Sequence, residues 1–142
     1  KYGYSIDEML NILNKKSGME GISGVSSDFR DLEEGAEKGN ERCALAREKF
    51  AYEVKKLIGA YAAVMGGVDA IIFTAGVGEN DALERMQIAS GLEYMGVKMD
   101  EDANNVRGEE RVISATDSKV KVLLIPTNEE LMIAMDTASL VG

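Results

Sequence analysis

Apolar residues recur at helical spacing along most of this chain. Helix signals flank these stretches: Ser5 is a candidate N-cap, and Gly18, Gly39 and Gly91 are candidate stops. The pattern predicts helices at about residues 5–16, 28–38, 40–65, 81–90 and 128–140, with a loop at 21–27. The last of these helices is apolar nearly all round, so we expect it to be buried.

Two short runs rich in β-branched residues predict strands, at residues 69–74 and 120–125. Weaker strand patterns occur at 97–99 and 111–114, with a turn of helix between them. Alternating helices and strands predict an α/β fold, with a parallel or mixed sheet covered on both faces. The two strong strands look fully buried, and two strands do not form a stable sheet. We therefore expect further strands outside this chain, which begins at Lys1 without a methionine, as a piece of a longer protein or a tag-cleaved product would.

The segment from Asp69 to Asn80 predicts a strand, a glycine turn containing Gly76 and Gly78, and then a helix. Glycines let backbone N–H groups approach an anion closely, and a helix N-terminus adds partial positive charge. The spacing is neither the dinucleotide Gly-x-Gly-x-x-Gly nor a P-loop. A phosphate or nucleotide site and an ordinary strand-to-helix turn both fit these residues.

The composition of the chain excludes several classes of function. The 142 residues include 16 basic and 25 acidic side chains, a net charge of −9, which repels nucleic acid and anionic membranes. The chain has no histidine, which excludes a histidine base, a Ser-His-Asp triad and histidine metal ligands within it. The single cysteine, Cys43, cannot form an internal disulfide and fits a reducing compartment. No segment approaches the roughly 20 apolar residues of a membrane span.

Polar residues follow the second strong strand, at Thr127 to Glu130. Ligands in open α/β sheets bind beyond the carboxyl ends of strands. If the two strong strands are parallel neighbours, this segment and the glycine turn share one rim of the sheet. Glu129 could then ligate Mg²⁺, which takes one or two carboxylates together with waters and phosphates. The alternative is that Asn128 caps the last helix and the glutamates complement its dipole.

A third candidate is the segment from Ser26 to Asp31. Arg30 offers a planar cation that can stack on a purine beside Phe29. Asp28 could accept a hydrogen bond from a ribose or a base. The alternative is that Asp28 or the preceding serine only caps the helix.

Taken together, these segments resemble the acetate kinase family, in the superfamily of acetate and sugar kinases, Hsp70 and actin. The resemblance covers essentially the whole chain, and the matching motifs stand in family order. They are Ser-Gly at 17–18, Gly-Ile-Ser-Gly at 21–24, Ser-Asp-Phe-Arg-Asp at 27–31, Phe-Thr-Ala-Gly-Val-Gly-Glu-Asn at 73–80 and Pro-Thr-Asn-Glu-Glu-Leu at 126–131. Each motif alone is weak, but the set is highly specific.

The resemblance implies a ribonuclease-H-like, actin-like ATPase fold, with residues 1–142 as one incomplete carboxy-terminal domain of mixed sheet and flanking helices. It implies phosphoryl transfer between ATP and acetate, giving ADP and acetyl phosphate, with Mg²⁺. The adenosine pocket would be lined by Asp28, Phe29 and Arg30, and Glu129 would take part in binding Mg²⁺. The nucleotide loop would consist of Gly76, Val77, Gly78, Glu79 and Asn80.

The resemblance also implies what this chain lacks. The family's catalytic aspartate, transition-state arginines and active-site histidine precede this segment, so we expect the chain to have no kinase activity alone. We also expect the full-length protein to be a cytoplasmic homodimer that takes part in acetyl-CoA biosynthesis. We expect no nucleic-acid or membrane partner. The alternatives are a propionate or other short-chain acyl kinase and a non-catalytic nucleotide-binding or interaction module.

Overall fold

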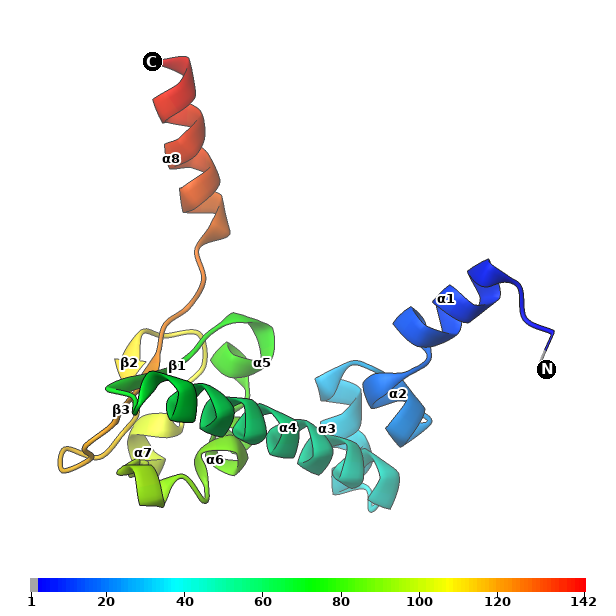
Figure 1. Ribbon diagram of the computed structural model, residues 1–142, viewed down its shortest axis with the longest axis horizontal. Helices are drawn as coiled ribbons and strands as arrows, with labels where there is room; N and C mark the ends of the chain where they lie inside the picture. The colour runs from blue at the N-terminus through cyan, green and yellow to red at the C-terminus, as the bar shows by residue number, and fades with distance from the viewer. Residues whose placement is uncertain (1–2) are drawn as a thin grey trace. The chain divides into compact units, whose positions relative to one another are not determined.

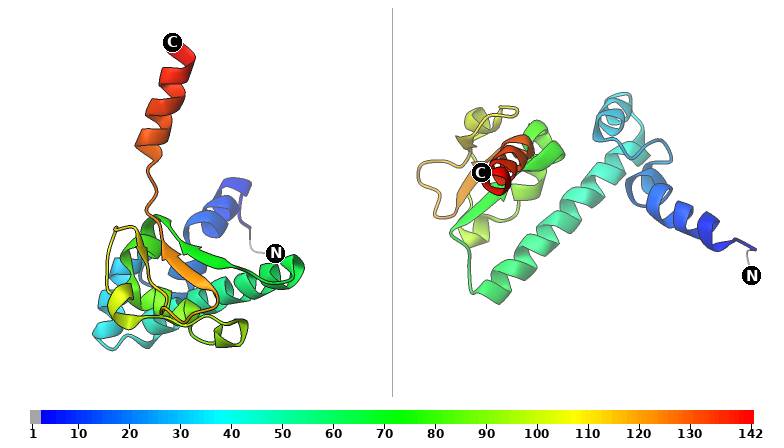
Figure 2. Two further views of the ribbon diagram at one scale, coloured as in Figure 1. Left: turned by 90° about the vertical axis from the view of Figure 1, so that its left-hand side faces the viewer. Right: turned by 90° about the horizontal axis from the view of Figure 1, so that it is seen from above.

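A computed structural model describes residues 3–142 of the chain (Figure 1, Figure 2). The chain divides into two compact units, one ending at Tyr61 and the other running from Ala62 to Gly142. Each unit has its own buried side chains and is described by itself.

Helices make up the first unit. They are α1 (Ile6–Lys15), α2 (Gly18–Ser23), α3 (Phe29–Glu37) and α4 (Glu41–Met65), the last of which crosses the division between the units. Ser5 begins α1 with a capping box, in which its side chain and that of Glu8 bond each other's backbone N–H groups. The buried cluster comprises Leu32, Cys43 and Ala46, with three partly buried side chains packed against it, those of Met19, Ile22 and Ala36.

The helices of the first unit agree with the sequence prediction except at α2, where a loop was expected from Gly21. Two side chains of this short helix, Met19 and Ile22, pack against the buried cluster, and Gly24 ends it in the left-handed conformation. Tertiary packing therefore stabilises a helix that its glycine-rich sequence does not predict.

The second unit contains a three-stranded mixed sheet in the order β1-β3-β2. β1 (Ala70–Phe73) runs parallel to β3 (Lys121–Leu124), and β2 (Arg111–Val112) is antiparallel to β3. The weak strand pattern at 97–99 appears only as two isolated bridges, from Val97 to Val120 and from Met99 to Ser114. The predicted mixed α/β sheet is confirmed.

The helices of the second unit are α5 (Ala75–Asn80), α6 (Ala82–Ala89), the 3₁₀ turn η1 (Glu93–Met95), α7 (Glu101–Asn104) and α8 (Glu129–Val141). Buried apolar side chains from β1, α6, β3 and the connecting segments form the core. They include Phe73, Ile88, Leu92, Val97, Ile113, Val122 and Leu124. α5 replaces the predicted glycine turn, because the chain becomes helical directly after Thr74.

Two predictions of burial are wrong. No residue of α8 is buried, although the helix is apolar nearly all round. β1 was expected to be a central strand, but it pairs only with β3 and leaves Ile72 54% exposed. Within the described residues nothing covers these side chains, and a helix or strand can bury only the surface that another element packs against.

Candidate functional site

The carboxyl ends of β1 and β3 lie at one edge of the sheet. Phe73 is paired with Leu124, and the Ile125 N–H donates to the Phe73 carbonyl at 3.0 Å. Residues 74–80 and 126–130 therefore leave the sheet side by side, as the sequence predicts for parallel neighbours. Ligands bind beyond this edge in open α/β sheets.

Glu79 joins these two segments. Its carboxylate Oε1 accepts hydrogen bonds from the N–H of Ala75 at 2.7 Å and from the N–H of Thr127 at 2.8 Å. The Thr127 hydroxyl donates to the same oxygen at 3.0 Å. These bonds, with that from the Thr127 N–H the largest, hold the pKa of Glu79 below its usual range. Glu79 thus keeps its negative charge while it fixes the relative position of the two segments.

The two glycines of α5 have room around them. Neither Gly76 nor Gly78 has a positive φ, and a Cβ on Gly76 would meet nothing within 4 Å. A Cβ on Gly78 would lie 3.4 Å from the Phe73 carbonyl carbon, an ordinary contact. The residue with left-handed backbone here is Ala75, at φ 59°. The fold therefore does not require glycine at 76 or 78.

Glu129 is the first residue of α8, and its side chain is exposed. Asn128 caps this helix by accepting a hydrogen bond from the Leu131 N–H at 3.1 Å, so the capping interpretation of Asn128 holds. Among residues 3–142 no group of three Cys, His, Asp or Glu side chains could hold a metal ion. A single exposed carboxylate fits Mg²⁺ as one ligand among waters and substrate phosphates.

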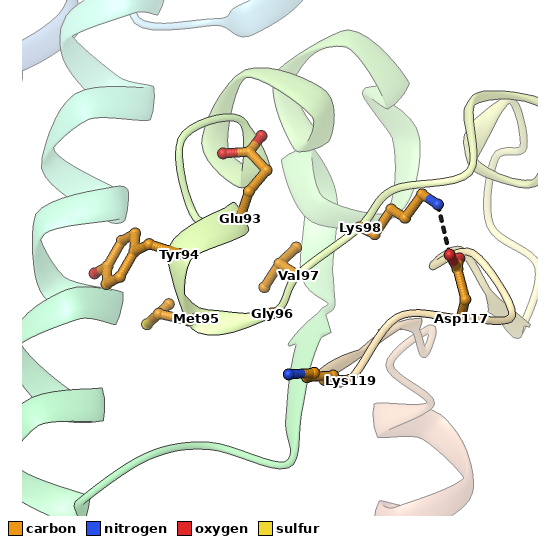
Figure 3. Close-up of a pocket in the computed structure, with 8 residues that line it drawn as sticks. All are labelled: Glu93, Tyr94, Met95, Gly96, Val97, Lys98, Asp117 and Lys119. Carbon is orange, nitrogen blue, oxygen red and sulfur yellow. Dashed lines mark hydrogen bonds and ion pairs between the residues drawn. The ribbon is translucent and has the colours of Figure 1, made fainter.

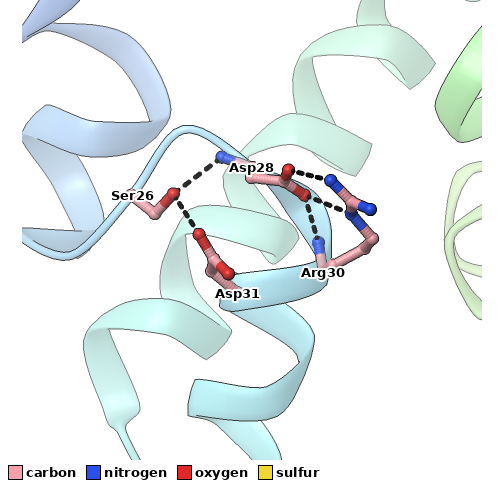
Figure 4. Close-up of polar contacts among 4 residues, drawn as sticks. All are labelled: Ser26, Asp28, Arg30 and Asp31. Carbon is pink, nitrogen blue, oxygen red and sulfur yellow. Dashed lines mark hydrogen bonds and ion pairs between the residues drawn. The ribbon is translucent and has the colours of Figure 1, made fainter.

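Asp28 caps α3 and also pairs with Arg30 (Figure 4). Its carboxylate accepts from the Arg30 N–H at 2.9 Å and from the Nη2 of the guanidinium at 2.7 Å. These contacts lower the pKa of Asp28 to about 2, the side-chain bond to Arg30 being the largest cause. Ser26 accepts from the Asp28 N–H and donates to Asp31 at 2.6 Å, which orders the turn before the helix.

Phe29 and Arg30 differ in what they can offer a ligand. The Phe29 ring meets Phe50 edge-on, with centroids 4.7 Å apart and planes at 71°, so it is part of the packing between α3 and α4. The Arg30 side chain is 89% exposed, and its planar guanidinium can stack on a base. These residues belong to the first unit, whereas Gly76–Asn80 and Glu129 belong to the second.

A surface hollow of about 510 Å³ lies elsewhere in the second unit (Figure 3). Its lining includes Tyr94, Gly96 and Lys119, and Lys98 pairs with Asp117 at 2.6 Å. None of the residues predicted from the sequence lines it. The hollow is therefore separate from the strand-end edge.

Two residues at this edge were not singled out as site residues from the sequence. Thr127 supplies two of the three bonds that hold Glu79. Arg85, fully buried in α6, donates to the carbonyl of Gly78 at 2.8 Å. The sequence does carry a signal that Arg85 is buried, because this charged residue lies on the same face of α6 as the apolar residues Ile88 and Ala89.

The arrangement of the sheet and its flanking helices is that of the ribonuclease-H-like, actin-like ATPase class. A crystal structure of Porphyromonas gingivalis acetate kinase matches 99% of this chain with a TM-score of 0.91 and 47% identity. A propionate kinase from Francisella tularensis matches 93% of the chain with a TM-score of 0.81 and 39% identity. The chain covers 35% and 33% of these two structures, respectively.

The sequence comparisons give the family. The model of the acetokinase family matches residues 1–135. The acetate kinase of Dictyoglomus turgidum is 64% identical over 135 residues, which are 95% of this chain and 33% of that protein. The chain belongs to the acetokinase family. It spans about a third of the length of the curated relatives it matches.

Among residues 3–142, no helix combines the length and the apolar character needed to cross a membrane.

Proposed function

We propose that this chain supplies the nucleotide side of an acetate kinase, which transfers the γ-phosphoryl group of ATP to acetate and gives ADP and acetyl phosphate. Family membership supports the reaction, and the strand-end edge of the second unit supports the position of the nucleotide loop. The reaction has a place in acetyl-CoA biosynthesis, and its use of ATP suits a cytoplasmic enzyme.

In this proposal Asp28, Phe29 and Arg30 line the adenosine pocket. Arg30 stacks on the base, because its guanidinium is planar and exposed. Asp28 orients Arg30 through their hydrogen bonds, and Phe29 anchors the start of α3 on Phe50.

The second unit would hold the phosphates and the metal. Gly76, Val77, Gly78, Glu79 and Asn80 form the nucleotide loop, and the Glu79 carboxylate keeps it beside Thr127. Glu129 contributes one oxygen ligand to Mg²⁺, which would neutralise charge on the phosphates when bound. The single domain predicted from the sequence remains part of this proposal, with the two units as its parts.

The room at Gly76 carries the proposal. An ordinary turn uses glycine for a left-handed backbone or because a Cβ would clash, and neither reason applies here. Open space beside Gly76 leaves room for close approach of a ligand to the backbone, which is one of the uses of glycine. The position of Gly76 at the carboxyl edge of the sheet is where such a ligand binds.

Gly76→Ala separates the two explanations. The variant should fold and be up to about 1 kcal/mol more stable than the wild-type chain, because alanine favours a helix. Its affinity for Mg-ATP, measured by calorimetry, should fall at least about tenfold, because the methyl group occupies the ligand's approach. Thr137→Ala, at an exposed position within α8, is the control and should bind as the wild-type chain does.

Two results would count against the proposal. The first is a folded Gly76→Ala chain that binds Mg-ATP as tightly as wild type. The second is a wild-type chain that binds no Mg-ATP at millimolar concentration, which would favour the alternative of a non-catalytic interaction module. Arg30→Ala tests the adenosine side and should weaken the binding of Mg-ATP.

The structural match to a propionate kinase keeps that second candidate reaction open. Acetate and propionate differ by one methylene, which an apolar pocket discriminates only about 10- to 200-fold. The resemblance places the acyl pocket outside this chain, so the comparison requires the full-length protein that carries it, assayed with both acids.

We further propose that the chain alone forms no acetyl phosphate and that it associates with a second copy. Trapping acetyl phosphate as its hydroxamate would reveal any activity, with a full-length relative as the positive control. No nucleic-acid or membrane partner is proposed, because the net charge of −9 repels both.

A further inference from the structure

Arg85 is a fully buried arginine whose guanidinium bonds to oxygen atoms of three separate residues. Nε donates to Asn104 Oδ1 at 2.8 Å, and Nη1 donates to the Gly78 carbonyl at 2.8 Å. Nη2 donates to the carbonyls of Asn104 and Val106, each at 2.7 Å. One side chain of α6 therefore connects the end of α5 to the turn that follows α7.

The turn after α7 makes a second connection to the same place. The Gly108 N–H donates to the Glu79 carbonyl at 3.0 Å, next to the carbonyl that Arg85 binds. The Asn104 amide donates to the Ala82 carbonyl at 2.8 Å, at the start of α6. We call Arg85 with residues 104–108 the brace.

Burial of this charge has a cost. Moving a cation out of water is unfavourable, and burial lowers the pKa of Arg85. Four hydrogen bonds offset this cost because the planar fork of arginine reaches several acceptors at once. A lysine has a single nitrogen and cannot span the same carbonyls. These bonds engage four of the five N–H groups of the guanidinium, and a buried network of this kind restricts its members to one arrangement.

We propose that Arg85 is a positioning residue that, through the brace, fixes the backbone of Gly78, Glu79 and Asn80 for binding the nucleotide. Arg85 acts from the buried side, so it touches no ligand itself. The claim that this fixed backbone helps to bind the nucleotide rests on the proposed function. The claim that the brace fixes the backbone does not.

Arg85→Lys tests the proposal, with Arg42→Lys as the matched control, because the guanidinium of Arg42 also donates to two carbonyls, those of Ile22 and Gly21, and lies outside the brace. Amide hydrogen exchange of the nucleotide-free chain reports on the brace. The Asp81 and Gly108 amides, bonded to Val77 and Glu79, should exchange at least about tenfold faster in Arg85→Lys. The Ile113 amide, bonded to Val122 in the sheet, should be unchanged in both variants.

Calorimetry with Mg-ATP then tests the consequence. Arg85→Lys should bind about tenfold more weakly than wild type, and Arg42→Lys should bind as wild type. If Arg85→Lys does not fold, Asn104→Ala replaces it, because that variant removes a brace partner and leaves the arginine in place.

Each outcome decides a separate point. Unchanged exchange of the Asp81 and Gly108 amides in Arg85→Lys would overturn the claim that the brace fixes this backbone. Faster exchange with unaltered Mg-ATP affinity would overturn its positioning role. A wild-type chain that binds no Mg-ATP would refute the proposed function, while the exchange rates would still decide whether the brace fixes the backbone.

Discussion

The carboxylate of Asp28 accepts hydrogen bonds from two groups of Arg30. It caps the first turn of α3 through the Arg30 N–H, and it pairs with the Arg30 guanidinium. Capping and ligand binding, which the sequence presents as alternatives, are therefore compatible at this residue. The cap fixes the start of the helix, and the pair fixes the orientation of an exposed cation that can stack on a base.

Removal of the guanidinium should raise the pKa of Asp28. The side-chain bond from Arg30 is the largest cause of its decrease from 3.8 to about 2. In Arg30→Met the pKa should rise toward 3.8 but stay below it, because the backbone N–H of residue 30 still donates. Carboxyl chemical shifts followed against pH by NMR measure this change.

The sign of the pH dependence follows from the same pair. Because the pKa of Asp28 is lower in the folded chain, its contribution to stability is present above pH 4 and is lost as the pH falls toward 2. Arg30→Met should flatten this part of the stability curve. Arg111→Met, which removes an arginine of β2 paired with Glu109, should leave the pKa of Asp28 unchanged. An unaltered titration in Arg30→Met would contradict the assignment.

The packing of α3 against α4 depends on the absence of a side chain at Gly35. A Cβ there would lie 2.6 Å from the Sγ of Cys43 and 3.2 Å from its Cβ. Cys43 is fully buried, so its sulfur has little room to move.

Gly35→Ala should therefore destabilise the chain by about 1–3 kcal/mol, although alanine favours a helix. Denaturant unfolding measures the change. Combining it with Cys43→Ala should cost less than the sum of the two single variants, since the shorter side chain removes the clash. Gly76→Ala is the opposite case, with open space around the position. A stabilising Gly35→Ala would show that the two helices can separate without cost.

Helix ends are the feature of the elements that the sequence predicts best. Ser5, Asp28 and Asn128 were identified as candidate caps, and each accepts the expected backbone hydrogen bond. The glycine segment after β1 was predicted less well. In its helical conformation the Glu79 carboxylate accepts hydrogen bonds from the N–H groups of Ala75 and Thr127, and Thr127 lies 48 residues further along the chain. Local sequence carries no signal for such a contact.

Apolar side chains remain exposed on several elements of the chain. They include Ile72 of β1, Leu10 and Leu13 of α1, and Leu131, Ile133 and Leu140 of α8. Within the described residues β1 also has a free hydrogen-bonding edge. Exposed strand edges and apolar patches favour association with another chain.

We therefore expect concentration-dependent self-association in light scattering. Ile72→Lys should reduce it, because a charge on an edge strand opposes pairing. Thr116→Lys is the control, since it also replaces a neutral residue with lysine, at another exposed position away from β1. A strictly monomeric mass for the wild-type chain at high concentration would contradict the expectation.

Periodicity, caps and motifs, which are local properties, were enough to predict the α/β class, most helices, both main strands and the family. The sequence did not establish that the two main strands are parallel neighbours. The structure shows that they are, and this pairing brings residues 74–80 beside 126–130. Burial and the brace were decided by tertiary structure alone. Arg85 lies within α6, but the oxygens that satisfy it come from Gly78 and from residues 104 and 106. Contacts between segments distant in sequence depend on how the chain folds back, which local pattern does not encode.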